Sequence, residues 1–429
     1  MLRMKGMRGV IAAGVFALAL GACDDLLTVS DPQRYTASDL DNALPAVANG
    51  VEGALHEVMD TYVVYQSLLS DVYQHTGTWS GYDETDHSRF LYGTSQMDGT
   101  NNSWLRARWF AEDAEERLER VLEGSAANDP MMAQIHMTAG LTDLYIGMAV
   151  CEAPAVSSGP AVSDMAILAQ AVEKLTRAMA TAQAAGTPEY GYAAQAGRAR
   201  AHLLLGNYAQ AAADAAAVPD GFSYDAVFNQ QSSNWVVTVT TATFNEAAGL
   251  MHKWWDQVAH SDGAGYMLDP WTGEADMRIP VYHTGEIATD NETPHYSQWK
   301  YQSEPQDIPM LHSDAMRLIQ AEAAWRAGDD AGARGYMDDL RTAAGLSPLP
   351  AGGDMQEYIL SERFAEMFME GMRMVDLYRF NIVAETFNAL NDPLRPGTGR
   401  IKKFSLTDTE ATYNAEIVND LAQRCLPTA

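Results

Sequence analysis

Residues 361–379 read SERFAEMFMEGMRMVDLYR, and this stretch carries the most specific pattern in the chain. Three of its glutamates stand four residues apart, which places them on one face of a helix. Carboxylates so spaced repel one another by roughly a few tenths of a kcal/mol per pair unless cations lie between them. The arginines of the same stretch offer such cations, and their planar heads bind carboxylates in bidentate pairs. We therefore expect a structural ion network of Glu362, Arg363, Glu366, Glu370, Arg373, Asp376 and Arg379.

The helix that carries this network is expected to span residues 356–380, with Gly371 inside it. A second interpretation of the glutamates is the acid/base pair of a glycosidase, because two carboxylates about 5–10 Å apart can do that chemistry. We prefer the structural network, since catalytic pairs of this kind lie in open aromatic clefts rather than among arginines.

Two segments upstream repeat one pattern around a glycine. Aligned on Gly206 and Gly328, alanines recur seven and five residues before the glycine and five residues after it. The aligned pairs are Ala199 with Ala321, Ala201 with Ala323, and Ala211 with Ala333. Small residues at these positions let two antiparallel helices approach closely, as in the tetratricopeptide hairpin. We expect such hairpins near residues 131–218 and 313–344, forming a spine with a protein-binding surface; the alternative is a set of unrelated alanine-rich hairpins.

Residues 219–310 form an aromatic insertion between the two repeats. Alanine becomes scarcer there, and Trp235–Thr243 (WVVTVTTAT) is predicted to be a strand. Sugars present apolar faces and hydroxyl edges, which suit flat aromatic side chains with polar neighbours. This insertion and the aromatic loop near residues 73–104 supply the candidate ligand-binding residues Trp79, Tyr82, Asn101, Asn102, Trp271 and Trp299. The alternative is that most of these aromatic side chains pack in the core.

The first 23 residues predict export and lipidation. A basic start precedes the apolar stretch Val10–Leu20, and Leu20-Gly21-Ala22-Cys23 resembles a lipobox. We expect residues 1–22 to be a lipoprotein signal peptide, Cys23 to carry the lipid, and residues 23–429 to form a single domain. The apolar stretch is too short to span a bilayer, so the acyl chains would be the membrane anchor.

Charge and cysteine content limit the partners. The 429 residues include 28 Lys and Arg against 57 Asp and Glu, a net charge of −29. This excess of acid excludes nucleic acid as a partner, because binding a polyanion needs a basic face. Export would favour a disulfide between Cys151 and Cys425, the alternative being two unpaired thiols. Neither cysteine has metal-ligand spacing to another Cys or to a His, and we predict no metal and no cofactor.

The last third of the chain resembles the SusD/RagB family of nutrient-uptake outer-membrane lipoproteins. The family pattern R-L-x-x-A-E-A is matched by Arg317–Ala323, and E-R-x-x-E-L-x-x-E-G-x-R-x-x-D-L-x-R is matched by Glu362–Arg379 with Met367 for the usual Leu. A block between them departs from the family, since Thr342 stands where an Arg is usual. The specific part of the resemblance covers residues 313–380.

This resemblance implies a mostly α, SusD-like fold, in which tetratricopeptide-type hairpins form a spine with irregular loop and short β insertions. It also implies a non-catalytic lipoprotein of the outer membrane and cell surface. Such a protein captures a nutrient, usually a glycan, and caps a SusC-like TonB-dependent transporter barrel. Two alternatives remain: a scaffold lipoprotein that binds only proteins, which predicts no exposed cleft in the aromatic region, and a hydrolase using a carboxylate such as Asp83 or Glu84.

Overall fold

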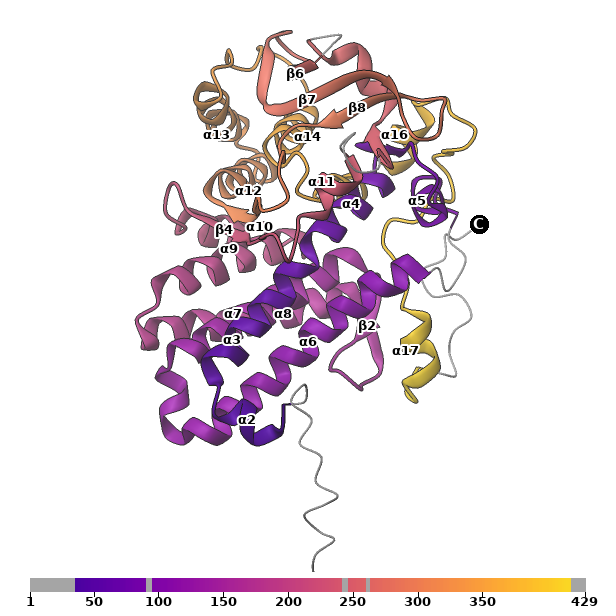
Figure 1. Ribbon diagram of the computed structural model, residues 1–429. Helices are drawn as coiled ribbons and strands as arrows, with labels where there is room; N and C mark the ends of the chain where they lie inside the picture. Colours follow the sequence, from indigo (N-terminus) through magenta and orange to yellow (C-terminus); the bar gives the residue numbers. More distant parts are fainter. Residues whose placement is uncertain (1–34, 90–94, 241–245, 260–262, 418–429) are drawn as a thin grey trace, which may run out of the picture. The chain divides into compact units, whose positions relative to one another are not determined.

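The computed structural model describes residues 35–89, 95–240, 246–259 and 263–417 (Figure 1). The predicted signal peptide 1–22 and the predicted lipidation site Cys23 lie outside the described residues. The chain divides into two units, an N-terminal unit Met1–Leu44 and a main unit Pro45–Ala429. In the N-terminal unit, the short helix α2 (Ala37–Asp41) begins with a capping box, in which the Thr36 side chain accepts from the Asp39 backbone N–H and the Asp39 carboxylate accepts from the Thr36 N–H.

Helical hairpins lie in the main unit where the repeat pattern predicts them. Their helices are α7 (Pro130–Ala149), α8 (Asp164–Ala185), α9 (Pro188–Leu204), α10 (Tyr208–Ala216), α12 (Ser313–Arg326) and α13 (Asp330–Ala343). Successive helices contact one another from α7 to α10, and α10 contacts α12 (Figure 1). All six aligned alanines are buried. The prediction of a mostly α fold with repeated hairpins is confirmed.

Close packing of α7 against α8 depends on two glycines. A Cβ atom at Gly140 would lie 2.7 Å from the Leu175 side chain, and one at Gly147 would lie 2.8 Å from the Leu168 side chain. The two leucines occupy the space that these side chains would fill, so the helices come closer than larger residues would allow. The connection between the helices is a small antiparallel ladder of β2 (Glu152–Pro154) and β3 (Ala161–Ser163).

The remaining helices flank these hairpins. They are α3 (Leu44–Glu57), α4 (Met59–Leu69), α5 (Ser80–Asp86), α6 (Ser95–Leu122), α11 (Trp235–Thr240), α14 (Met355–Glu366), α15 (Arg373–Arg379), α16 (Val383–Asn388) and α17 (Asp408–Tyr413), with the 3-10 turns η1 (Glu123–Asn128) and η2 (His252–Gln257). Strands are short and antiparallel. They pair as β1 (Tyr73–His75) with β5 (Ala248–Leu250), as β4 (Ser223–Ala226) with β9 (Ile308–His312), and in the order β6 (Gly263–Leu268), β7 (Ala275–Ile287), β8 (Pro294–Gln298).

The predicted strand at Trp235–Thr243 is wrong where the structure describes it, because residues 235–240 form the helix α11. The Asp60 carboxylate, from α4, accepts a hydrogen bond of 2.7 Å from the Trp235 backbone N–H at the start of this helix. The valines at 236, 237 and 239 are buried. A cap from a distant helix and burial of the apolar face therefore override the β propensity of a valine- and threonine-rich segment.

The predicted helix 356–380 is also wrong, because it breaks into α14 and α15. Gly371 has φ +73°, a left-handed conformation that no residue inside an α-helix adopts. The break frees backbone carbonyls, and side chains from elsewhere bind them: the Lys300 ammonium donates to the Phe368 carbonyl at 2.9 Å, and the Tyr62 hydroxyl donates to the Gly371 carbonyl at 3.2 Å. The two short helices can thus meet at an angle that one continuous helix could not take.

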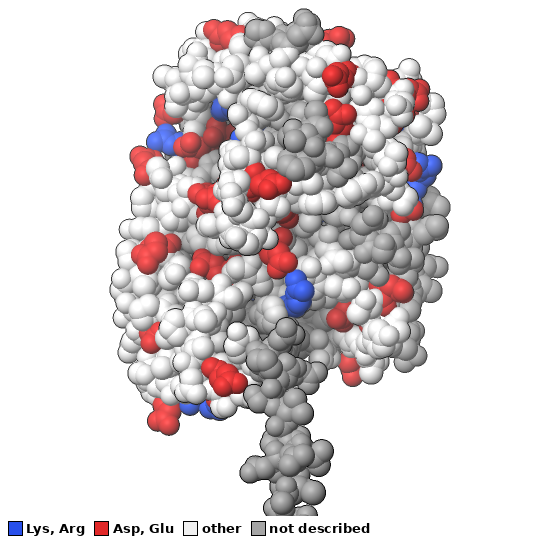
Figure 2. Space-filling view, in the orientation of Figure 1, with Lys and Arg blue, Asp and Glu red and all other residues white. Residues whose placement is uncertain are grey.

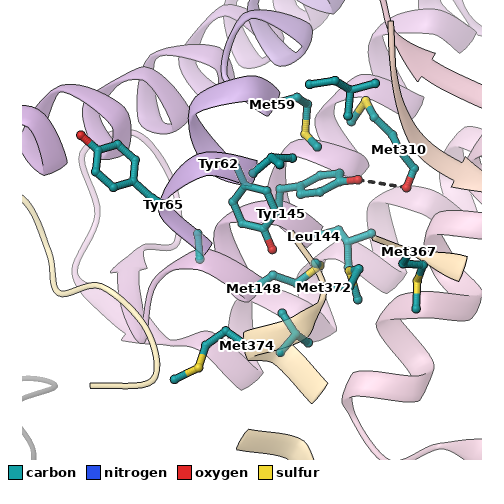
Figure 3. Close-up of a cluster of buried hydrophobic side chains, with 14 of the residues drawn as sticks. Met59, Tyr62, Tyr65, Leu144, Tyr145, Met148, Met310, Met367, Met372 and Met374 are labelled. Carbon is teal, nitrogen blue, oxygen red and sulfur yellow. Dashed lines mark hydrogen bonds between the residues drawn. The ribbon is translucent and has the colours of Figure 1, made fainter. Parts of the chain in front are cut away.

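A core rich in methionine and tyrosine surrounds this break (Figure 3). Tyr62 lies edge-on to both Trp104 and Tyr145, with ring centroids 5.9 and 5.4 Å apart. The Tyr145 hydroxyl donates to the Met310 carbonyl at 3.1 Å, so its polar end is satisfied inside the core (Figure 3). This core joins α4, α7, β9 and the segment between α14 and α15.

Candidate functional site

An aromatic pocket of about 360 Å³ lies in the main unit between η2, the β6–β7 connection and α14. Its apolar lining includes Trp254, Trp271 and Phe364. The pocket also contains Ser361 and Gln257, whose polar side chains can hydrogen bond to a ligand. A volume of this size lies within the range of small-molecule sites, which starts at about 300 Å³.

The aromatic walls are held by neighbouring side chains. Trp254 stacks on Phe364 with ring centroids 4.9 Å apart and an interplanar angle of 12°. Its indole N–H donates to the Asp71 carbonyl at 2.6 Å, which fixes the rotation of the ring. Trp271 lies edge-on to Tyr358 at 4.7 Å. Both tryptophans are therefore preorganised, and little side-chain entropy would be lost when a ligand binds against them.

A buried triad lies at one side of the pocket. The Asp71 carboxylate, which is fully buried, accepts from Arg373 at 2.7 and 2.8 Å and from the Lys253 ammonium at 2.5 Å. Burial alone would raise the pKa of Asp71, but the charges of Arg373 and Lys253 outweigh that effect and hold it well below its usual range. Lys253 also lies 4.1 Å from the centre of the Trp254 ring, a cation–π contact. The triad ties α4 and η2 to the start of α15.

The glutamates of residues 361–379 bind cations from other parts of the chain. Glu362 accepts from Arg341 at 2.6 Å and from Arg278 at 2.8 Å, and Glu366 lies 3.4 Å from Arg278. These bonds separate the negative charges that the sequence places on one face. Because each carboxylate is engaged with a guanidinium in a buried setting, the cluster lacks the open geometry of a glycosidase pair.

The third glutamate, Glu370, has a different set of partners. It is bound by Lys300 at 2.8 Å and by His312 at 3.1 Å. Burial raises the pKa of Glu370, but the interactions with Lys300 and His312 outweigh that effect and lower the pKa to about 2. Burial lowers the pKa of His312, and the charge of Glu370 outweighs that in turn, so this pKa is raised.

The arginines of the same segment also reach distant carboxylates. Arg363 binds Asp376 at 2.9 Å, within the segment, whereas Arg379 forms two bonds of 2.8 Å with Glu322 on α12. Arg373 binds Asp71, which lies 302 residues earlier. Sequence reasoning identified the seven charged residues of the segment and missed the partners Asp71, Asp269, Arg278, Lys300, His312, Glu322 and Arg341. Two of these partners carried a signal in the sequence: Glu322 and Arg341 lie in the two segments that precede 361–379 in the resemblance to the SusD/RagB pattern.

The six candidate ligand residues fall in four separate places. Trp271 lines the aromatic pocket, and Trp299 stacks on Tyr282 with ring centroids 4.5 Å apart. Trp79 stacks on Trp235 at 5.8 Å, and its neighbour is Tyr82. The remaining pair, Asn101 and Asn102, donates to the Ser405 carbonyl at 3.3 Å and to the Thr409 hydroxyl at 3.1 Å.

Two of these candidates are buried against the protein. Tyr82 is 2% exposed and its hydroxyl accepts the indole N–H of Trp235 at 2.7 Å, while Asn101 is 5% exposed. Neither presents side-chain surface to a ligand, so we leave both out of the site. Trp254 and Phe364, which do line the pocket, were not among the six candidates.

One group of described residues has the composition of a metal site. Ligand atoms of His312, Asp314 and Glu366 lie within 4.8 Å of one another. The His312 ring, however, already bonds Glu370 through Nε2 and accepts from the Ala315 backbone N–H through Nδ1. With both ring nitrogens engaged, the group is a network for capping α12 rather than an open ligand set.

Cys151 is disulfide-bonded, and its predicted partner Cys425 lies outside the described residues. Within the part of the chain that the structure describes, no helix has both the length and the apolar character to cross a membrane. Figure 2 shows that Asp and Glu are spread over the face drawn there, with few Lys or Arg between them. This distribution agrees with the net charge of −29.

Comparison with known proteins shows which family part of the chain matches and which solved structures share its fold. Residues 291–420 match the family model described as the SusD family. A SusD superfamily protein from Bacteroides vulgatus is 15% identical with a TM-score of 0.64, over 83% of this chain and 91% of that chain. A SusD-like carbohydrate binding protein from Bacteroides vulgatus is 15% identical with a TM-score of 0.60, over 79% of this chain and 83% of that chain.

A laminarin binding SusD-like protein is 16% identical with a TM-score of 0.56, over 80% of this chain and 93% of that chain. No curated protein sequence matches this chain. At these identities the solved structures establish the fold, and the family model identifies the segment that carries the arginine and glutamate network. Residues 291–420 of this chain thus resemble the SusD family, and the chain has the fold of solved SusD-like proteins.

Proposed function

We propose that this protein is a non-catalytic, lipid-anchored surface protein that captures a glycan and delivers it to a SusC-like TonB-dependent transporter of the outer membrane. The observation that carries the proposal is the aromatic pocket formed by Trp254, Trp271 and Phe364 in a chain of SusD-like fold. Two structures of the same fold are described as carbohydrate binding and laminarin binding.

The chemistry of the pocket suits a sugar. The two indole rings offer flat apolar surfaces for the C–H faces of a pyranose, and Ser361 and Gln257 offer hydrogen bonds to its hydroxyls. A volume of about 360 Å³ favours one or two sugar rings over a long chain segment. The ligand would then enter by its end.

Delivery to a transporter requires only modest affinity. A binding protein tethered at the mouth of a barrel meets its partner in an effectively intramolecular reaction, at local concentrations that reach about the millimolar range. A site of modest affinity releases its ligand readily, which such a handover needs. The predicted lipid on Cys23 would supply the tether.

The two alternative functions fit the geometry less well. A scaffold that binds only proteins predicts no cleft among the aromatic residues, whereas Trp254 and Trp271 line one. A hydrolase needs a free carboxylate pair. Asp83, one candidate, is paired with His87 at 2.9 Å and with Arg89 at 2.8 Å.

Glycan binding can be tested with the full chain in mild detergent. The panel is laminarin, starch, xylan, polygalacturonate, alginate and chondroitin sulfate, screened by affinity electrophoresis and followed by calorimetry on the best ligand. We expect Trp271→Ala to weaken binding at least about tenfold, because a stacked aromatic residue contributes on the order of 1–3 kcal/mol. The matched control is Trp109→Ala, which removes a 50% exposed tryptophan of α6 outside the pocket.

Failure of all six glycans to bind would contradict the capture role. Binding that is equally strong in Trp271→Ala would contradict the placement of the site. Delivery is tested separately, by purifying tagged protein from outer membranes and identifying what accompanies it by mass. A barrel-sized partner in stoichiometric amount is the expected result, and recovery of the protein alone would contradict delivery.

A further inference from the structure

The charges around the aromatic pocket indicate which class of glycan it accepts, an inference that rests on the proposed function. Five charged side chains line the pocket: Lys253, Asp269, Asp276, Glu357 and Arg373. The first question is whether the two cations among them are available to an anionic ligand. If they were, the pocket would suit uronic acids or sulfated sugars.

Both cations are already committed. The Lys253 ammonium and the Arg373 guanidinium bind the same carboxylate of Asp71, at 2.5 Å and at 2.7 and 2.8 Å. Asp71 is fully buried, so the charge of its carboxylate depends on these two side chains for compensation rather than on water. An anionic ligand that drew either cation into the pocket would leave the buried Asp71 carboxylate with one ion-pair partner fewer. Loss of an ion pair around a buried charge is strongly unfavourable.

Two further carboxylates of the pocket lining, Asp269 and Asp276, add negative charge. Asp269 is bound by Arg341 at 2.9 Å, and Asp276 is bound by Arg278 at 2.7 Å. The same two arginines also bind Glu362 and Glu366. Two arginines thus pair with four carboxylates, which leaves two negative charges in excess. The Asp71 triad has one positive charge in excess, so it offsets only part of this negative charge.

Glu357 is the remaining charged group of the lining. It lies in the first turn of α14, its side chain is exposed, and the described residues offer it no ion-pair partner. A carboxylate accepts hydrogen bonds from sugar hydroxyls and repels another carboxylate or a sulfate. Ser361 follows one turn later on the same helix and also lines the pocket.

We propose that the pocket selects uncharged sugars over anionic ones and that Glu357 is a residue that determines this selectivity. Its carboxylate receives hydroxyl groups of a neutral sugar and, with the carboxylates of Asp269 and Asp276, repels uronic acids and sulfated sugars. The ion pairs of Lys253 and Arg373 with Asp71 weaken the attraction that would otherwise favour those ligands.

The test uses short oligosaccharides of laminarin or starch, whichever bind better, in three forms, because these glucans carry the C6 hydroxyl that is oxidised. These are the unmodified form, the form oxidised to a carboxylate at C6, and the methyl ester of the oxidised form. We expect oxidation to weaken binding about tenfold, the effect of a unit charge at close range in a partly hydrated site. Methyl esterification should restore most of the loss, because it removes the charge and keeps the added atoms.

The variant Glu357→Gln identifies the residue. We expect it to weaken the neutral form a few-fold, because an amide accepts weaker hydrogen bonds than a carboxylate, and to strengthen the oxidised form, so that the tenfold gap largely closes. The control Glu173→Gln removes an exposed carboxylate of α8, away from the pocket, and should change neither affinity. Salt at about 0.5 M should narrow the gap in the unmodified protein, because screening weakens charge repulsion.

The outcomes separate the two proposals. Preference for alginate, polygalacturonate or chondroitin sulfate, with binding lost in Trp271→Ala, would overturn the charge inference and leave glycan capture intact. An unchanged gap in Glu357→Gln would overturn the role of this residue. Absence of binding to every glycan would overturn the capture function, and the charge inference with it.

Discussion

Replacing Gly371 by alanine tests the break between α14 and α15 most directly. The residue has φ +73°, and a side chain in this left-handed conformation costs about 1–2 kcal/mol. Its Cβ would also lie 2.5 Å from Cε1 and 2.9 Å from Cδ1 of Tyr62. That ring is 1% exposed and wedged between Trp104 and Tyr145, so it cannot move aside, and overpacking of this kind costs about 1–3 kcal/mol. We expect Gly371→Ala to lower the free energy of unfolding by about 2–5 kcal/mol.

Two other glycines separate the contributions. Gly328 has φ +84° and open space around its Cα, so Gly328→Ala should show the backbone cost alone. Gly50 lies within α3, exposed and with open space, so Gly50→Ala should raise stability by about 0.5–1 kcal/mol through its better helix propensity. The series therefore predicts a gain, a moderate loss and a large loss for one and the same substitution.

The measurement is equilibrium unfolding in urea, followed by circular dichroism and by tryptophan fluorescence. The free energies are compared at constant slope, which scales with the surface exposed on unfolding. A loss in Gly371→Ala no larger than that in Gly328→Ala would refute the steric argument. Restoration of part of the loss by a second change, Tyr62→Leu, would show that the ring is the obstacle.

Two further predictions concern buried charge. Burial raises the pKa of Asp60 to about 7 from an ordinary 3.8. The stability that Asp60 contributes is therefore fully present below about pH 4 and is lost as the pH rises toward 7. Asp60→Asn should flatten this part of a stability–pH profile measured from about pH 4 to about pH 8. Glu322 is fully buried and binds Arg379 through two bonds of 2.8 Å, so Glu322→Gln should lower the free energy of unfolding in urea by about 3–5 kcal/mol. The control Glu57→Gln breaks an exposed pair with Arg106 at 3.6 Å and should lower it by less than about 1 kcal/mol. Equal losses of stability in the two variants would contradict the dependence on burial.

The repeated hairpins could be predicted because their pattern is local. Ala199 and Ala211 are spaced by the geometry of two helices and one turn, and the same spacing returns at Ala321 and Ala333. A signal of this kind does not depend on what packs against it. The mostly α fold and the family assignment follow from the same kind of information.

Features set by distant residues could not be predicted. Gly371 inside an apolar helical pattern is compatible with a continuous helix, and only the donors Lys300 and Tyr62 make the break favourable. The valine-rich segment at 235–240 becomes a helix because Asp60 caps it. These partners are separated from their targets by between 68 and 309 residues.

The candidate site was predicted only in part for a similar reason. Aromatic composition directed attention to the insertion, where Trp271 lines the pocket, but it could not tell an exposed ring from a buried one. Tyr82 is buried because Trp235 and Trp79 cover it, and Phe364 lines the pocket because it stacks on Trp254 of η2. Exposure is a property of the packed chain rather than of its composition.

The ion pairs and hydrogen bonds of the segment 361–379 also affect how this chain can fold. The portion recognised by the family model, 291–420, holds the two short helices, yet Asp71, Arg278 and Tyr62 all lie before residue 291. A fragment cut to that portion would carry Arg373 without Asp71, Glu362 with Arg341 but without Arg278, and a break without its hydroxyl donor. We therefore expect that fragment not to fold by itself. Contacts between residues so far apart in sequence form late, so we expect the most family-specific region to be among the last to become ordered.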